Sequence, residues 1–123
     1  MTKDNKKKNI IDEKAFEFAK EIVFAYKVMT KEKKEFVMTK QMLRSGTSIG
    51  ANVREAVESH TKKEFASKMS ISLKEANETL YWIQLLHETG YMGKKDYDLL
   101  FDNNLEIKRI LSAIVKTTKE GLK

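Results

Sequence analysis

The residue types that most often perform acid–base or metal chemistry are scarce in this sequence. It has no cysteine and only two histidines, His60 and His87, which excludes thiolate nucleophiles and cysteine-bound metals. A di-iron helical bundle needs Glu-x-x-His on two helices, but three residues after Glu55 and after Glu75 the chain has another glutamate. We interpret both histidines as surface or boundary residues. We therefore expect no catalytic residue, cofactor site or metal site, and no enzyme activity.

Two glycines, Gly46 and Gly50, lie four residues apart in a stretch that otherwise has a helical pattern. They lack the Gly-Lys-Ser/Thr of a phosphate-binding loop, and they follow a helix rather than a strand. Glycine in a helix interior costs about 1 kcal/mol relative to alanine, so a compensating contact is expected. We predict close approach of another backbone here, either from the same bundle or from a second subunit.

A polar face of small side chains runs through the same stretch. At about 100° per residue, one side of the helix carries Arg44, Ser48, Ala51, Asn52 and Glu55. This face is distinct from the apolar stripe that would face a core. It is either part of an interface or an ordinary solvated surface.

The following helical stretch carries two apolar stripes where one is enough for a bundle helix. The second stripe is spaced by four, three, four and three residues and consists of Ile71, Glu75, Glu78, Trp82 and Leu85. Since interfaces favour aromatic residues and paired charges, we predict a subunit interface at Ile71 and Trp82, with Glu75 and Glu78 pairing with Arg44 or Arg54. The alternative is that Trp82 only covers the core of the monomer.

Lysines concentrate near both ends of the chain and at its middle. An up-down bundle would bring these segments to one end of the molecule, which would collect Lys3, Lys6, Lys7, Lys8, Lys62, Lys63, Lys116, Lys119 and Lys123. The acids expected nearby are Asp4, Glu58, Glu64 and Glu120. Lysines that contact phosphates release counterions and bind nucleic acid without reading bases. We predict nucleic-acid binding by Lys6, Lys7, Lys8, Lys62, Lys63, Lys116 and Lys119, the alternative being a solubilising tail.

The elements that position these residues are four long helices. The 123 residues include no proline and five glycines, with 34% charged and 41% hydrophobic residues and a net charge of +6. Apolar residues recur at helical spacing over residues 12–30, 33–59, 61–90 and 94–119. Short connections make successive helices antiparallel neighbours. We predict an all-α fold, an antiparallel up-down four-helix bundle over residues 11–123, preceded by a flexible basic tail over residues 1–10.

The start of the chain is basic, but an amphipathic helix follows where a signal peptide would have an apolar segment. No run approaches the roughly 20 apolar residues of a membrane span. We therefore expect a soluble cytoplasmic protein without membrane association.

One stretch carries a family resemblance: Leu43-Arg44-Ser45 followed by Ser48-Ile49-Gly50-Ala51-Asn52-Val53-Arg54-Glu55-Ala56. It resembles the small bacterial four-helix-bundle proteins encoded in intervening sequences of 23S rRNA genes, which are also described as a ribosomal protein family. Phe65, residues 72–80 and residues 90–97 support the likeness, which covers nearly the whole chain. Gly50 stands where many members have proline, and Ala56 where many have glycine.

The resemblance implies a homo-oligomer, a pentamer in particular, in a family whose cellular role is poorly defined. The chain is also similar to the accessory proteins of diversity-generating retroelements, which associate with a reverse transcriptase and nucleic acid. We therefore expect a non-enzymatic oligomeric protein that binds RNA or a ribonucleoprotein through basic surface. The alternative is a protein–protein interaction scaffold that does not bind nucleic acid directly.

Overall fold

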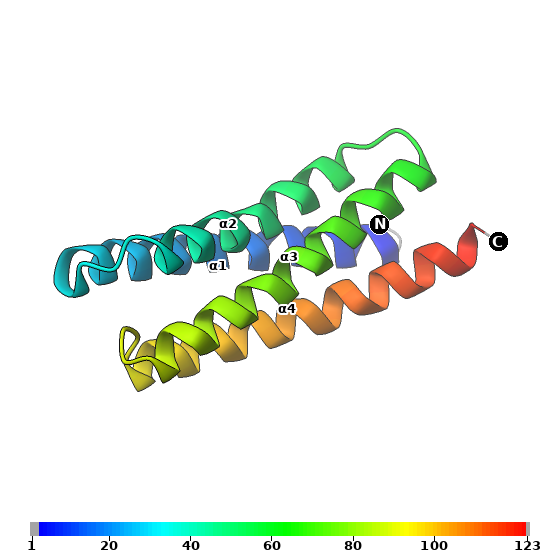
Figure 1. The fold of residues 1–123 in the computed structure, drawn as a ribbon. Coiled ribbons are helices and arrows are strands. Elements are labelled where there is room, and N and C mark those ends of the chain that lie inside the picture. The colour runs from blue at the N-terminus through cyan, green and yellow to red at the C-terminus, as the bar shows by residue number, and fades with distance from the viewer. Residues whose placement is uncertain (1–2, 123) are drawn as a thin grey trace.

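A computed structural model describes the backbone of residues 3–122, with side chains from residue 10 onward. Within these residues all secondary structure is helical, which confirms the predicted all-α class (Figure 1). The helices are α1 Lys3–Lys33, α2 Met38–Val57, α3 Lys62–Glu88 and α4 Lys94–Gly121.

The four helices form an antiparallel up-down bundle, as predicted. Each helix packs against the next in the chain, and α1 packs against α4, although this is the least closely packed pair of neighbours. The N-terminus, the α2–α3 connection and the C-terminus lie at one end of the molecule (Figure 1). The α1–α2 and α3–α4 connections lie at the other end.

The core is formed by apolar residues that recur at helical spacing in the four helices. In α1 the buried stripe consists of Ile11, Ala15, Phe18, Ile22, Ala25 and Met29. Asn104 of α4 is also fully buried, but neither its Nδ2 nor its Oδ1 has a hydrogen-bond partner among the described residues. An unpaired buried amide costs about 1–3 kcal/mol, so Asn104 lowers the stability of the bundle relative to an apolar residue at this position.

The helix α1 begins at Lys3, whereas we predicted a flexible tail over residues 1–10 and a helix from about residue 12. Neither glycine nor proline precedes Gly46, and extending a formed helix by one residue is far easier than nucleating one. The side chains before residue 10 lie outside the described part, and the predicted nucleic-acid residues Lys6, Lys7 and Lys8 are among them.

The connection between α1 and α2 covers residues 34–37, not the predicted 30–33. Lys34, with a positive φ of 55°, ends α1. Phe36 falls within the helical stretch predicted over residues 33–59, but it lies in this connection with 58% of its surface exposed. The prediction for Phe36 was wrong because an aromatic residue fits the helical spacing without revealing whether the backbone there is helical.

The start of α2 is determined by a carboxylate that the sequence analysis did not single out. Glu35 is buried, and its side chain accepts hydrogen bonds from the backbone N–H groups of Val37 (3.1 Å), Met38 (2.9 Å) and Thr39 (2.8 Å). The hydroxyl of Thr39 donates to the carbonyl of Glu35 at 2.7 Å. These bonds satisfy backbone N–H groups at the start of α2 that have no partner within the helix. The negative charge of Glu35 is also stabilised by the positive end of the helix dipole.

The two glycines of α2 allow α1 to pack closely. A Cβ atom on Gly50 would lie 3.3 Å from the carbonyl oxygen of Ala15, and one on Gly46 would lie 2.9 Å from the side chain of Ile22. Of the two origins considered for this close approach, the structure therefore supplies the one within the bundle.

We expect Gly50→Ala to lower the free energy of unfolding by about 1–2 kcal/mol. Overpacking against the backbone of Ala15 costs about 1–3 kcal/mol, and the higher helix propensity of alanine offsets up to about 1 kcal/mol of it. Urea unfolding followed by circular dichroism measures the change. Gly121→Ala is the control, because a Cβ there has no neighbour within 4 Å. A Gly50→Ala protein as stable as the control would contradict the close contact.

We expect Glu35→Ala to lower the free energy of unfolding by about 0.5–2 kcal/mol, the range measured for lost helix N-terminal caps. Glu32→Ala, at an exposed position near the end of α1, is the control and should change stability by less than about 0.5 kcal/mol. Equal effects of the two substitutions would show that the cap contributes nothing particular.

Candidate functional site

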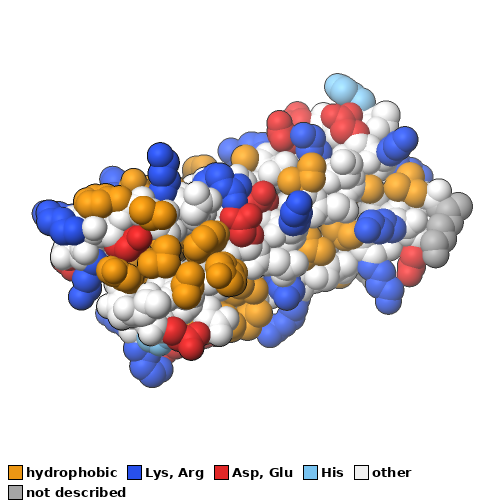
Figure 2. All heavy atoms as spheres, in the orientation of Figure 1, with side chains coloured by type: hydrophobic (Ala, Val, Ile, Leu, Met, Phe, Trp, Pro, Cys, Tyr) orange, Lys and Arg blue, Asp and Glu red, His pale blue; other side chains and the backbone are white. Residues whose placement is uncertain are grey.

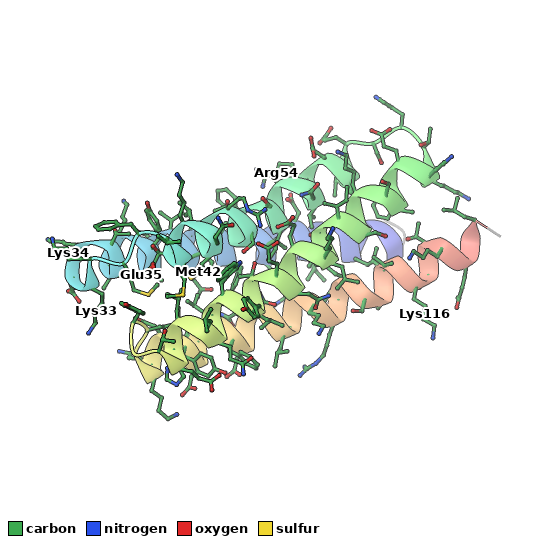
Figure 3. All side chains as sticks on the ribbon, in the orientation of Figure 1. Lys33, Lys34, Glu35, Met42, Arg54 and Lys116 are labelled. Carbon is green, nitrogen blue, oxygen red and sulfur yellow. The ribbon has the colours of Figure 1, made fainter. Side chains whose placement is uncertain are left out.

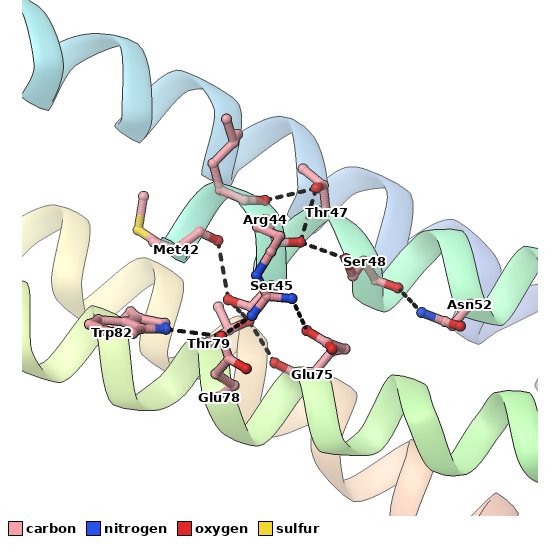
Figure 4. A network of polar contacts seen from close by, with 11 residues as sticks. Met42, Arg44, Ser45, Thr47, Ser48, Asn52, Glu75, Glu78, Thr79 and Trp82 are labelled. Carbon is pink, nitrogen blue, oxygen red and sulfur yellow. Dashed lines mark hydrogen bonds and ion pairs between the residues drawn. The ribbon is translucent and has the colours of Figure 1, made fainter. Parts of the chain in front are cut away.

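Arg44 of α2 lies against two glutamates of α3, as the sequence predicted, but the pairing forms within one chain (Figure 4). Its Nη1 is 3.2 Å from Oε2 of Glu75, and its Nη2 pairs with Glu78. The indole N–H of Trp82 donates to the same Glu78 oxygen at 3.1 Å. Within the single chain, these charges are satisfied between α2 and α3.

In the Arg44 cluster, defined as Arg44, Glu75, Glu78 and Trp82, the contacts favour the charged forms of Glu78 and Arg44. The hydrogen bond from Trp82, followed by the hydrogen bond and charge of Arg44, lowers the pKa of Glu78 against the opposing effect of burial. The hydrogen bond with Glu78 in turn raises the pKa of the Arg44 guanidinium. A carboxylate held in its ionised form is poorly suited to donate a proton. The cluster thus has the properties of a structural ion pair.

Hydroxyl groups beneath the cluster hold α2 and α3 close together. The Thr79 hydroxyl is 2.9 Å from the Ser45 hydroxyl, and the Ser72 hydroxyl donates to the carbonyl of Ile49 at 2.8 Å. All four residues are buried. Ile49, which the sequence analysis named in the family motif, therefore belongs to the core of the chain.

The remaining predicted residues of this face make local contacts. The Ser48 hydroxyl donates to the carbonyl of Arg44 at 2.6 Å, and the Asn52 amide donates to the carbonyl of Ser48 at 2.8 Å. Glu55 pairs with Lys68 of α3 at 3.3 Å. Ile71 remains exposed. Arg44, Glu75, Glu78 and Trp82 thus contact one another. Ser48, Asn52, Glu55 and Ile71 lie on the same two helices but outside this set of contacts.

Hydrophobic side chains gather beside the charged cluster, over the first half of α2 and the second half of α3 (Figure 2). Trp82 is half-buried against the core, and its ring meets Tyr81 edge-on with 5.1 Å between centroids. Tyr81 is exposed, as is Val37 just before α2. Trp82 thus covers part of the core and also has exposed surface. This placement is compatible with a subunit interface and with a role limited to covering the monomer core.

Four predicted nucleic-acid residues lie at the end of the bundle that holds the termini, in the first turn of α3 and the last turns of α4: Lys62, Lys63, Lys116 and Lys119 (Figure 3 labels Lys116). All four are exposed, and none forms an ion pair with another described side chain. Three glutamates, at positions 58, 64 and 120, are exposed at the same end. Residues 1–9 carry four lysines and one aspartate, and residue 123 is a lysine, so these ten positions supply +4 of the net charge of +6.

The sequence analysis missed an acidic groove between α1 and α4. It has a volume of about 350 Å³ and is lined by Glu13, Lys14, Glu17, Phe18, Glu21, Asn103, Glu106 and Ile107. The amide of Asn103 donates to both oxygens of Glu21, at 2.9 and 3.0 Å, and Lys14 pairs with Glu106. The spacing of Glu13, Glu17 and Glu21 by four residues was the available signal.

Other classes of site were sought over the same residues. No group of three or more histidine, aspartate or glutamate side chains is placed to hold a metal ion in the described part of the chain. None of the described helices combines the length and apolar character needed to cross a membrane.

Residues 7–113 match the family described as 23S rRNA-intervening sequence protein. Among solved structures, the chain is similar to a protein of unknown function from the S23 ribosomal protein family of Bacteroides thetaiotaomicron. The two sequences are 48% identical, the match covers 89% of this chain and 98% of that one, and the TM-score is 0.87. No curated protein matches the chain.

The lowered pKa of Glu78 predicts a specific loss of stability in acid. The unfolded chain takes up a proton near the ordinary pKa of 4.5 and the folded chain only at lower pH, so the stabilisation is present above pH 4.5 and is lost as the pH falls through the folded pKa. Glu78→Gln should weaken this pH dependence. Melting temperatures between pH 3 and pH 7 measure it, with exposed Glu88→Gln as the control. Parallel curves for Glu78→Gln and the control would contradict the role of the pair.

Proposed function

The chain belongs to the 23S rRNA-intervening sequence protein family, and on this premise we propose that it is a non-enzymatic, homo-oligomeric cytoplasmic protein that binds RNA or a ribonucleoprotein through basic surface. The observation that carries the proposal is the set of unpaired, exposed lysines at the end of the bundle that holds both termini. Phosphate contacts by such lysines need no defined pocket, because the interaction is long-range and electrostatic.

The distribution of charge favours a contact that extends beyond the described residues. Three glutamates lie at the same end of the bundle as Lys62, Lys63, Lys116 and Lys119. Residues 1–9, in contrast, contain four lysines and only one aspartate. We therefore assign the larger part of the electrostatic attraction to Lys6, Lys7 and Lys8 together with the other lysines of that segment.

We further propose that the protein assembles into a homo-oligomer, for which the family resemblance suggests a pentamer. The half-buried Trp82 and the exposed Ile71 and Tyr81 support this, because an isolated bundle gains nothing from apolar side chains on its outer surface. A reverse-transcriptase-like protein is a candidate partner, from the resemblance to retroelement accessory proteins.

The second candidate is a protein–protein interaction scaffold without direct RNA binding. The hydrophobic side chains beside the Arg44 cluster favour it (Figure 2). Recovery of a specific partner protein in a pull-down that survives nuclease treatment, together with no affinity of the purified protein for RNA, would support this candidate over the first.

RNA binding is tested by filter binding to a structured RNA across a salt series. Replacing Lys62, Lys63, Lys116 and Lys119 with glutamine should weaken binding, and the slope of log affinity against log salt should fall by roughly 0.7–0.9 for each phosphate that is no longer neutralised by a lysine. Replacing Lys6, Lys7 and Lys8 should have at least as large an effect.

The control removes the same number of lysines from the opposite end of the bundle, with Lys27, Lys31, Lys33 and Lys95 changed to glutamine. It should retain most of the affinity and the salt slope. Equal losses in the control would show that binding is not localised to the proposed end, and absence of binding at 50 mM salt would overturn the RNA proposal.

A further inference from the structure

The seam between α1 and α4 has few contacts that hold it closed. It is the least closely packed pair of neighbouring helices, and the acidic groove lies in it. Asn103 donates to Glu21 across the seam. Lys14 pairs with Glu106, but these side chains are 42% and 49% exposed, and such an exposed ion pair adds little stability.

Large apolar side chains beside the seam do not close it either. Phe24 lies three residues after Glu21 on α1, and Leu99 lies four residues before Asn103 on α4. Phe24 remains 62% exposed and Leu99 50% exposed. Apolar area that stays in contact with water does not stabilise the closed seam.

Asn104 lies at about the level of Ile22 and Gly46, because its neighbour Asn103 contacts Glu21 and a Cβ on Gly46 would touch Ile22. At this level the buried residues of α1 and α2 are in close contact. Asn104, on α4, is fully buried in the same part of the core.

The buried polar groups near this level are paired on one side of the bundle and unpaired on the other. The hydroxyls of Ser45 and Thr79 lie between α2 and α3 and bond to each other at 2.9 Å. The amide of Asn104 has no partner among the described residues. Water would solvate this amide once α4 separated from α1, so opening the seam recovers free energy that closing it costs.

The start of α4 is anchored to the end of α3. The ring of His87 stacks on Tyr97 with 4.1 Å between centroids, and its Nδ1 is 2.9 Å from the carbonyl oxygen of Met92. The buried Met92 also donates its backbone N–H to the carbonyl of Leu86 at 3.0 Å. At its other end α4 runs to an exposed last turn (Figure 1). The anchored start can therefore act as a pivot.

We propose that α4 swings away from α1 about this anchored start while the protein remains folded, and that the unpaired amide of Asn104 favours the open form. The movement exposes Phe18 and Ile107, which line the groove and are 1% and 2% exposed in the closed bundle. The helices α1, α2 and α3 stay packed through the close contacts at Gly50 and Ser72. This inference depends neither on RNA binding nor on assembly.

Thiol labelling tests the opening, because the chain has no native cysteine. Leu111→Cys places a thiol on the buried side of α4, and Ser72→Cys places one between α2 and α3; both positions are 0% exposed. Each variant is labelled with a disulfide reagent in native buffer, and its rate is compared with the rate expected from its own urea-unfolding equilibrium. Leu111→Cys should react at least about tenfold faster than global unfolding allows, and Ser72→Cys at the rate of global unfolding.

The role of Asn104 is tested in the chain with Leu111→Cys. Asn104→Leu removes the unpaired amide and should slow labelling by about fivefold or more. Thr79→Val is the matched control, because it also replaces a buried polar side chain, but one whose hydroxyl is already bonded, and it should not slow labelling. Circular dichroism melting verifies that each variant is folded.

The outcomes separate the two parts of the proposal. Labelling of Leu111→Cys at the rate of global unfolding would overturn the opening, and equally fast labelling of Ser72→Cys would overturn it too, because the whole bundle would then be loosening. Fast labelling that Asn104→Leu leaves unchanged would overturn the role of Asn104, as would equal slowing by Thr79→Val.

Discussion

The close approach of α1 to α2 at Gly46 and Gly50 is the constraint on which the remaining structure depends. The backbone of Ala15 and the side chain of Ile22 occupy the space that side chains at these two positions would need. On its other side α2 meets α3 through the small residues Ser45 and Ser72. With small residues towards both neighbours, α2 is held close to each, and the less closely packed seam is left between α1 and α4.

This packing determines which groups remain available at the surface. Since α2 and α3 lie close together, Arg44 reaches Glu75 and Glu78 of the same chain, and the polar motif that the sequence offered as an interface is largely satisfied internally. The adjacent aromatic side chains have no such partners. In contrast, the looser α1–α4 seam leaves carboxylates and apolar side chains exposed side by side. The surface chemistry thus follows from unequal packing around the bundle.

Much of the fold was predictable, because the stripes of α1, α3 and α4 repeat at helical spacing without interruption. The start of α3 follows a recognisable pattern, Thr61-Lys62-Lys63-Glu64, in which the hydroxyl of Thr61 accepts a hydrogen bond from the N–H of Glu64 at 3.0 Å. The start of α2 was not visible in the same way, because the Glu35 side chain accepts hydrogen bonds from the N–H groups two to four residues later, and no short pattern indicates this cap. The predicted pairing of Arg44 with Glu75 and Glu78 is present, between α2 and α3 of the same chain.

The sequence by itself determined the number of helices, their antiparallel order and most of the residues that face the core, because periodicity within one helix decides which side is apolar. Only the tertiary structure decided which helices approach most closely, that Ile49 is core and Phe36 is not, and that Glu13, Glu17 and Glu21 line an open groove. These properties depend on distances between helices, and such distances result from side-chain volumes on two elements at once, which a pattern along one segment does not contain.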